Sequence, residues 1–518
     1  MPGSHHGGIS APSAFMNSYP SRLGPLFPLF FLAAFFVAAL FFFTRENRFA
    51  FFYHPDEPGK VEQVQTAQWN FHHPVFMLTT ARAAAKATLS PAEMENKQQV
   101  VEMGRFVSAA FTAGAATFLA GTLWLIAGPF AAAAAALLLA TNHQLFELAH
   151  YFKEDTSLLF GTAVWFFALT LHAKRRTLGS AALVGAGAAL AVSAKYIGAF
   201  APVLSLFLVP LAAPKGKRLA ALAAFVVTLA GVVSVVNLPL LRNLAGFEHG
   251  FDREIKLVVD GQGKTTRSVP HSVYWTAFQQ NVIFFLWPLL AWFYFTCWKR
   301  RKTLSVAEWT LALFPIAFLV VLSFSPKTND RYFLPATALF LCGAALGLNA
   351  LRPLLPKRVP ALALLGIVTL PQLPDLVEYY RAFRHDDVRE LSEWLNRELP
   401  DAKIAIDRKV LLPNPRQDEY HPYQVPLKAE VMRGNVESFR TVRALREAGI
   451  THVVLSESAY GRYFDDDLRP QRGAEKSHSE KTQLYESLLS GKKPLWERER
   501  NKVIYLHPGL RVHALPEP

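Results

Sequence analysis

The chain has 518 residues, of which 51% are hydrophobic and only 18% are charged, and its formal net charge is +14. Soluble domains carry more charge than this, so the composition excludes an ordinary soluble protein. Two cysteines are too few for a disulfide framework. Much of the positive charge lies in short loops between apolar blocks, which indicates membrane topology rather than nucleic-acid binding.

Apolar blocks recur along the chain at about the 17–20 residues that a helix needs to cross a bilayer. They predict a polytopic α-helical membrane protein with about eleven transmembrane helices. The Gly/Ser/Pro-rich residues 1–24 precede the first block, and we expect them to be a disordered cytoplasmic tail. The predicted spans are 25–43, 103–127, 129–147, 157–172, 178–194, 197–213, 219–240, 278–296, 305–324, 333–351 and 359–375.

Four short loops between these spans are basic and contain no acid, namely 172–176, 214–218, 298–302 and 352–358. Under alternating topology all four lie on one side, which the positive-inside rule identifies as cytoplasmic. The first span argues for the opposite orientation, because Arg45 and Arg48 follow it on the predicted outer side and only Arg22 precedes it on the inner side. The four concordant loops outweigh this single signal. We therefore expect a cytoplasmic N-terminus and an extracytoplasmic C-terminus in a cell inner membrane.

Acidic residues follow a second pattern. Among the Asp and Glu residues up to Asp375, only Glu308 lies near a cytoplasmic helix end, and the others lie in outer loops or at outer helix ends. Acids contribute little to orientation, so this asymmetry is not a consequence of the basic loops. It indicates that an acidic site is assembled on the outer face.

The composition changes after Asp375 to a charged, soluble pattern. Residues 25–375 are therefore predicted to form the transmembrane domain, and 376–518 a periplasmic or extracytoplasmic α/β domain. Alternating strands and helices predict a partly parallel sheet there. The strands are expected at 402–407, 451–456, 501–507 and 510–515, and the helices at 388–399, 438–449 and 480–489.

Four outer segments carry chemically active side chains. Asp56 and Glu57 stand between two prolines after the first span, and loop 242–264 carries His249 and Glu254. The other two segments contribute Glu147, His150, Lys153, Glu154 and Asp155, and Lys327, Asp330 and Arg331.

Each segment also has an ordinary structural interpretation. An acid followed by proline is a common helix start, so the local pattern alone favours a capping role for Asp56. His72 and His73 lack the spacing of metal ligands, which favours packing roles. Lys195 is harder to explain structurally, because it interrupts two apolar blocks, and an ionisable group at such depth usually faces a cavity or a partner.

Taken together, the outer segments favour a functional site. Lysine and arginine can hold a phosphate or pyrophosphate, and a carboxylate can take a proton from an acceptor hydroxyl. Carboxylates and cations on several outer turns are what an anionic, lipid-linked substrate requires.

Five stretches, in this order, resemble those of a known superfamily. They are "HPDEPGKVEQ" from residue 54, "NFHHPVFML" from 70, "YFKEDTSLLFG" from 151, "SAKYIGAF" from 193 and "DRYFLPATALF" from 330. Over about residues 25–375 the chain resembles the GT-C superfamily of integral-membrane glycosyltransferases. The similarity is to the glycosyltransferase family 39-like branch, which contains protein O-mannosyltransferases and the lipid A aminoarabinose transferase.

The resemblance implies a polyprenyl-phosphate sugar as donor and Asp56 as the general base, with Glu57 supporting or orienting it. Asp155, beside Lys153 and Glu154, matches an acid that lines the donor or acceptor site. The resemblance also places Lys195, Tyr196, Arg331 and Tyr332 among the donor- or acceptor-binding residues. Lys195 and Arg331 would lie near the lipid phosphate. His249 and Glu254 belong to the same group, but no clear motif fixes their positions.

The sequence departs from the family in two places. His72-His73-Pro74 replaces the commoner double proline, and the extra luminal modules of eukaryotic protein mannosyltransferases are absent from this sequence, which disfavours that specific activity. Some family members use a divalent metal, which Asp56, Glu57 and Asp155 would hold if one is used. The sequence implies no other cofactor.

These inferences predict an inverting glycosyltransferase, hexosyl or pentosyl, that acts on the outer face of the membrane. Its partners would be the polyprenyl-phosphate sugar, a lipid, glycan or protein acceptor with a free hydroxyl, and membrane lipids, but no nucleic acid. The alternatives are a lipid or solute transporter or flippase that uses the outer charged cavity, and a scaffold on a degenerate GT-C core. Acids clustered at one face disfavour the transporter, in which polar groups extend through the membrane.

Overall fold

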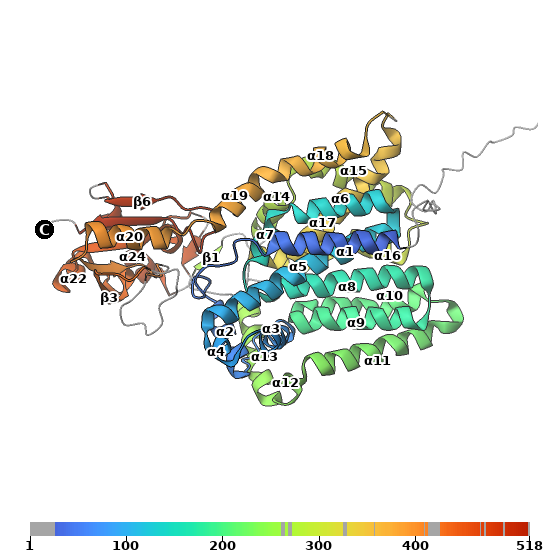
Figure 1. The fold of residues 1–518 in the computed structure, drawn as a ribbon, viewed down its shortest axis with the longest axis horizontal. Helices are drawn as coiled ribbons and strands as arrows, with labels where there is room; N and C mark the ends of the chain where they lie inside the picture. The colour runs from blue at the N-terminus through green and yellow to red at the C-terminus, as the bar shows by residue number, and fades with distance from the viewer. Residues whose placement is uncertain are drawn as a thin grey trace, which may run out of the picture.

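The computed structural model of the protein places a helical bundle beside a smaller α/β domain (Figure 1). It describes residues 26–260, 265–267, 272–324, 329–356, 358–408, 410–412, 425–466, 468–470, 473–490 and 493–515. Lys327 lies outside the described residues.

The described residues between 26 and 383 are mainly helical. The helices are α1 Phe27–Phe43, α2 Glu57–Thr66, α3 Phe76–Thr88, α4 Pro91–Glu95, α5 Lys97–Ala127, α6 Pro129–Ala140, α7 His143–Ala149, α8 Glu154–Arg175, α9 Leu178–Ala194, α10 Phe200–Ala212, α11 Arg218–Val236, α12 Leu238–Leu241, α13 Leu244–Asp260, α14 Ser272–Asn281, α15 Trp287–Lys299, α16 Val306–Ser323, α17 Leu334–Leu351, α18 Ala361–Thr369 and α19 Leu373–Phe383.

Six helices within the described residues are long and apolar enough to cross a membrane, or seven if the bent pair Val273–Asn281 and Phe284–Lys299 forms one span. Four more apolar helices, α1, α6, α9 and Tyr196–Ala212, have 10–17 residues. Each of the eleven predicted ranges overlaps one of these helices. The protein is therefore a multi-pass helical membrane protein, and the count of eleven crossings stays a prediction.

Small residues allow the central helices to approach closely. Helix α5 packs against α1, α6 and α8, and α8 packs against α9. A Cβ atom added at Gly161 of α8 would lie 2.4 Å from the backbone nitrogen of Ala191 in α9, and one at Gly187 would lie 2.6 Å from the Cα of Trp165. This contact uses small residues in the way common to membrane helix pairs.

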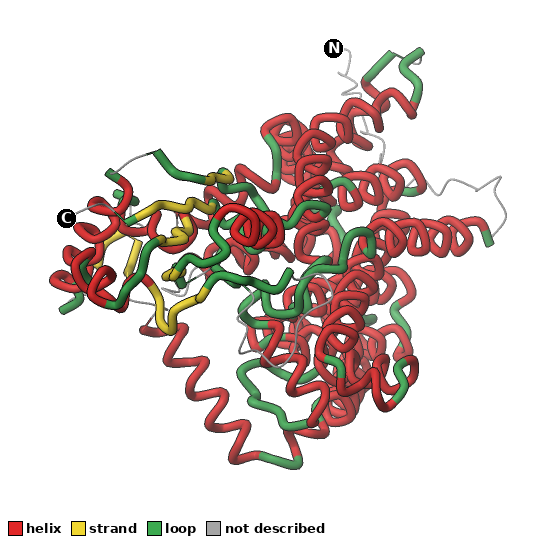
Figure 2. Tube along the Cα trace, turned by 60° about the vertical axis from the view of Figure 1, so that its left-hand side comes forward, coloured by secondary structure: helices red, strands yellow, loops and turns green. Residues whose placement is uncertain are grey.

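The C-terminal domain has a mixed five-stranded sheet at one end of the molecule (Figure 2). Its strand order is β3-β2-β4-β7-β6, with β2 parallel to β3 and β4, and β7 antiparallel to β4 and β6. The strands are β2 Lys403–Ile406, β3 Glu430–Asn435, β4 His452–Ser456, β6 Trp496–Arg498 and β7 Leu510–Ala514; the helices are α20 Asp387–Glu398, α21 Val436–Phe439, α22 Val442–Glu447, α23 Glu457–Tyr460 and α24 Glu475–Leu489.

Helix and strand elements both join this domain to the bundle. Helix α19 leads directly into it, and β1 Thr265–Arg267, from the connection between α13 and α14, pairs with β5 Leu468–Pro470 in an antiparallel ladder.

The strand predicted at 501–507 is wrong, because this segment forms turns. Val503 and Leu506 are both fully buried although they are three residues apart, whereas a strand buries alternate residues. His507 holds the segment against α19, since its Nε2 lies 2.7 Å from the carbonyl oxygen of Ala382.

The packing of α8 on α9 makes Gly161 a sensitive position. We expect Gly161→Ala to force the two backbones apart, to cost roughly 1–3 kcal/mol, and to lower the apparent melting temperature. The matched control is Gly231→Ala on α11, where no described atom lies within 4 Å of an added Cβ. There, alanine gains up to about 1 kcal/mol of helix propensity. Scanning fluorimetry in lipid nanodiscs measures the melting temperatures of the two variants. Equal melting temperatures would contradict the close packing of α8 on α9.

Candidate active site

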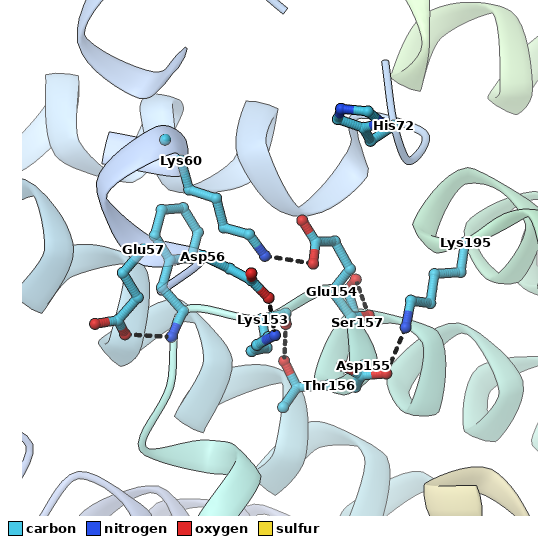
Figure 3. Close-up of polar contacts among 12 residues, drawn as sticks. Asp56, Glu57, Lys60, His72, Lys153, Glu154, Asp155, Thr156, Ser157 and Lys195 are labelled. Carbon is cyan, nitrogen blue, oxygen red and sulfur yellow. Dashed lines mark hydrogen bonds and ion pairs between the residues drawn. The ribbon is translucent and has the colours of Figure 1, made fainter. Parts of the chain in front are cut away.

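Asp56 stands at the N-cap of α2, but its side chain makes no hydrogen bond to the helix backbone. Instead it accepts a hydrogen bond from the ammonium group of Lys153, in the turn before α8 (Figure 3). The capping role that the local pattern favours is therefore wrong. The Asp56 side chain is 45% exposed, whereas that of Lys153 is 2% exposed. A buried cation thus holds a carboxylate that solvent and ligands can reach.

Arg331 lies between two carboxylates. It belongs to a short 3-10 turn, Asp330–Phe333, immediately before α17. Its Nη2 lies 3.9 Å from Oδ2 of Asp56, and its Nε lies 3.6 Å from Oδ2 of Asp155. The guanidinium group therefore connects the loop before α2 with the turn before α8.

Asp155 also binds Lys195, with 2.6 Å between Nζ and Oδ1, and both side chains are buried. The Lys195 ammonium group lies 4.5 Å from the centre of the Tyr332 ring, a cation–π contact. Of the two predicted surroundings for Lys195, a cavity or a partner, the structure shows a partner. Four of the five resembling stretches meet here, although they are far apart in the chain.

Glu154 pairs with Lys60 of α2, and both side chains are nearly buried (Figure 3). Sequence reasoning missed Lys60. The signal was available, because Lys60 lies one helical turn after Asp56 and therefore faces the same side of the bundle as that residue.

Glu57 does not share the environment of Asp56. Its carboxylate accepts hydrogen bonds from Nε and Nη2 of Arg105 at 3.0 and 2.5 Å, and both side chains have zero exposed area. It also accepts from the backbone N–H of Phe152 at 2.9 Å. Figure 3 shows the Asp56 and Glu57 side chains pointing apart. Glu57 is thus an anchor that fixes α2 against α5 and the turn before α8.

Among the described residues, this network contains five basic side chains and four carboxylates, so it carries one net positive charge when Lys153 is protonated. The cations are Lys60, Arg105, Lys153, Lys195 and Arg331, and the carboxylates are Asp56, Glu57, Glu154 and Asp155. An anion that comes close to Asp56 would therefore meet a positive field.

The charges in the network also set protonation states. Burial raises the pKa of Asp56, but the charges of Lys153 and Lys60 outweigh it and hold that pKa well below its usual range. Burial, with the charges of Arg331 and Lys60, lowers the pKa of Lys153 to about 7. Burial and the charge of Lys153 likewise lower the pKa of His54, so its ring is neutral and Nδ1 accepts the backbone N–H of Asp56 at 3.2 Å.

A cavity of about 710 Å³ opens beside this network, between the bundle and the C-terminal domain. Lys153, Arg331 and His54 line it, together with residues of the turn segment that includes Tyr505. Sequence reasoning missed this contribution, because it assigned 501–507 to a strand inside the α/β domain. Hydrophobic alternation was the only local signal there.

The remaining predicted residues lie on two other segments. The Tyr196 hydroxyl donates to the carbonyl oxygen of Phe71 at 2.9 Å, so it fixes the loop that contains His72 and His73. His249 and Glu254 belong to α13, where His249 is exposed and Glu254 is partly buried. The loop predicted to cover the site is thus mainly a helix.

The three carboxylates named as ligands for a metal do not form one site. Asp56, Glu57 and Asp155 pair with different cations, Lys153, Arg105 and Lys195. Among the described residues, no group of three His, Cys, Asp or Glu side chains has the geometry to hold a metal ion. This set therefore does not fit a shared metal.

The Glu57–Arg105 pair leads to a stability prediction. Glu57→Gln leaves the buried Arg105 charge uncompensated, so we expect a loss of roughly 3–5 kcal/mol and a clearly lower melting temperature. The control is Glu393→Gln, which removes half of the exposed Arg389–Glu393 pair on α20. Such pairs contribute only about 0.3–0.5 kcal/mol. If Glu57→Gln and Glu393→Gln have the same melting temperature, Glu57 is not the anchor that these contacts indicate.

Several solved structures are similar to the chain. ArnT from Cupriavidus metallidurans, bound to undecaprenyl phosphate, shares 15% identity with a TM-score of 0.49, over 84% of this chain and 94% of that one. The Archaeoglobus fulgidus oligosaccharyltransferase shares 12% identity with a TM-score of 0.46, over 83% of this chain and 69% of that one. The S. cerevisiae protein O-mannosyltransferase Pmt1–Pmt2 complex shares 16% identity with a TM-score of 0.34, over 49% and 36%.

A sequence-family comparison is more informative. No curated protein matches the chain significantly. Residues 89–253 match the family of dolichyl-phosphate-mannose-protein mannosyltransferases. The matched range contains α5, the Lys153–Asp155 turn and Lys195, whereas Asp56 and Arg331 lie outside it. The match confirms the predicted resemblance: over these residues the chain is similar to a family of membrane glycosyltransferases.

Proposed function

We propose that the protein is an inverting glycosyltransferase, which moves a sugar from a polyprenyl phosphate to an acceptor hydroxyl at the outer face of a cell membrane. The observation that carries the proposal is the position of Asp56. Its half-exposed carboxylate lies between two cations, Lys153 and Arg331, beside a cavity. The family match supports the class of reaction.

Donor binding is the first step. Lys153 and Arg331 both contact Asp56 in the structure, and both line the cavity. The phosphate of the donor carries negative charge, so it competes with Asp56 for these cations, and the guanidinium group of Arg331 offers it paired donors. The excess positive charge of the network favours this exchange.

The exchange also activates the base. Once Lys153 turns toward the phosphate, it stabilises the Asp56 carboxylate less, and the pKa of Asp56 rises toward the range in which a general base works well. Asp56 then takes the proton of the acceptor hydroxyl. The acceptor oxygen forms its bond to the anomeric carbon as the bond from that carbon to the phosphate oxygen breaks.

The leaving group receives the electron pair of the broken bond, and the polyprenyl phosphate departs with one additional negative charge. Lys153 and Arg331 stabilise that charge in the transition state. Because the nucleophile and the phosphate occupy opposite faces of the sugar, a single displacement inverts the anomeric configuration. The proposal covers hexosyl and pentosyl donors.

The surrounding residues position Asp56, Lys153 and Arg331. Glu57 fixes the start of α2 through Arg105, and Glu154 holds Lys60 beside Asp56. Asp155 binds both Lys195 and Arg331, so it sets the position of the guanidinium group. We assign Glu57 and Asp155 as positioning residues, and Asp56 as the catalytic residue.

The first functional prediction concerns Asp56. We expect Asp56→Asn to lower kcat for transfer by about 10²- to 10⁴-fold, because the amide cannot take the acceptor proton. Binding of undecaprenyl phosphate should persist, since Lys153 and Arg331 remain. Release of labelled polyprenyl phosphate from a polyprenyl-phosphate sugar measures turnover.

The control variant is Glu62→Gln, which alters an exposed acid on the same helix. It should turn over donor at the wild-type rate. A well-folded Asp56→Asn protein that releases polyprenyl phosphate as fast as wild type would refute the base assignment. Passage of lipid or solute across vesicles without donor turnover by the wild type would support the transporter alternative.

The second functional prediction concerns pH. The donor is a phosphodiester with a constant single negative charge near neutrality, whereas Lys153 has a pKa lowered to about 7, chiefly by burial. Raising the pH through that value neutralises the ammonium group, so kcat/KM for the donor should fall above pH 7. This parameter reports groups of the free enzyme.

Lys153→Arg provides the matched variant, because the arginine side chain stays charged throughout this range. Its kcat/KM for the donor should lose the decline near pH 7, even if its maximum is lower. An identical decline in the variant would assign the titration to another group.

A further inference from the structure

The cavity also has uncharged and acidic lining residues besides Lys153, Arg331 and His54. Its wall in the bundle contains Glu147, Tyr151 and Asp330, and its wall in the C-terminal domain contains Asn501 and Tyr505. Carboxyl, amide and phenol groups therefore face the same space from two domains. At about 710 Å³, the cavity has the size of sites that enclose a small organic ligand.

Tyr151 is the unexplained group in this wall. The residue is 1% exposed, and its hydroxyl has no hydrogen-bond partner among the described residues. Its ring lies edge-on against Tyr505, with centroids 5.5 Å apart, and 4.9 Å from the His54 ring. An unpaired buried hydroxyl is costly, and native structures usually provide a partner. A ligand hydroxyl in the cavity would be that partner.

Glu147 lies four residues before Tyr151 and also lines the cavity. Burial and the charge of Asp330 raise the pKa of Glu147 to about 8. Its carboxyl group is therefore mostly protonated at neutral pH, and it can both donate and accept a hydrogen bond. Glu147 and Tyr151 together offer a ligand complementary donors and acceptors without a strong charge.

This combination fits a saccharide. Sugar rings present several hydroxyls, which bind carboxyl and amide groups, and C–H faces, which pack on partly exposed aromatic rings such as that of Tyr505. The neighbouring ring of His54 places the same wall next to Asp56, because His54 accepts the Asp56 backbone N–H at 3.2 Å. A hydroxyl held at this wall thus lies on the base side of the centre.

We propose that Tyr151 and Glu147, with Tyr505 of the C-terminal domain, form a subsite for a saccharide acceptor beside Asp56. This inference rests on the proposed glycosyl transfer, and it makes the acceptor a carbohydrate rather than a serine or threonine side chain. Tyr151 and Glu147 bind and position the acceptor, and the C-terminal domain closes the subsite.

The test is equilibrium binding of methyl glycosides and disaccharides to the full-length protein in lipid nanodiscs. Nanodiscs avoid the sugar headgroups of common detergents. Calorimetry would use wild type saturated with undecaprenyl phosphate, and Asp56→Asn saturated with undecaprenyl-phosphate mannose. We expect saturable binding of at least one saccharide in both samples.

Tyr151→Phe should weaken that binding by roughly 3- to 10-fold, the loss expected for one hydrogen bond. Glu147→Leu should weaken it at least as much. Affinity for undecaprenyl phosphate should stay unchanged in both. The matched control is Tyr274→Phe, which removes a fully buried hydroxyl that does not line this cavity.

Absence of saccharide binding, or equal affinity in wild type and Tyr151→Phe, would overturn the inference. Saccharide binding that undecaprenyl-phosphate mannose abolishes would assign the subsite to the donor sugar instead, which also overturns it. Saccharide binding that depends on Tyr151, in a protein that does not bind undecaprenyl phosphate, would refute the proposed function but leave a saccharide site. The two failures are thus distinguishable.

Discussion

The buried ion pair of Arg105 and Glu57 is the interaction on which the site depends. Two charges without any exposed area are tolerated only when they are paired and fully hydrogen-bonded. Arg105 therefore also donates to the carbonyl oxygens of Asn47 and Phe49, and Glu57 accepts the N–H of Phe152. These contacts fix the first loop, α5 and the turn before α8 in one arrangement. Only in that arrangement do Asp56 and Lys153, the neighbours of Glu57 and Phe152, come into contact.

Exposure separates the roles of the four carboxylates. The side chains of Glu57, Glu154 and Asp155 are at most 7% exposed and are held by cations, whereas that of Asp56 is 45% exposed. A buried carboxylate in a tight ion pair organises structure, because moving it costs the whole pairing energy. A half-exposed carboxylate can exchange its partner for a phosphate. Three carboxylates of the network therefore have structural roles, and Asp56 is the one that can exchange its partner.

The sequence predicted the location of the site better than its contacts. Acids at predicted outer helix ends and cations near them indicated one charged face, and Asp56, Asp155, Lys195 and Arg331 do come together. Sequence position also grouped Asp56 with Glu57, but consecutive residues at a helix start point in different directions. The partner of Glu57, Arg105, lies 48 positions away within a largely apolar helix, and only the packing of α2 on α5 brings the two together.

Tertiary structure also determined the second half of the cavity. The hydrophobic alternation of 501–507 is typical of a strand, yet burial of Val503 and Leu506 turns the segment toward the bundle and places Tyr505 beside His54. Tyr151 adjoins an apolar run, and it differs from a core tyrosine because it has an unpaired hydroxyl and also lines the cavity. An unpaired hydroxyl beside a cavity can be recognised only in a three-dimensional structure.

The most direct measurement is an electron cryomicroscopy structure of the protein in nanodiscs with a bound polyprenyl-phosphate sugar, using Asp56→Asn to prevent turnover. The account predicts the phosphate within hydrogen-bond distance of Lys153 and Arg331, with the anomeric carbon between the phosphate and the side chain at position 56. A phosphate bound elsewhere, with Lys153 and Arg331 still directed at position 56, would contradict it.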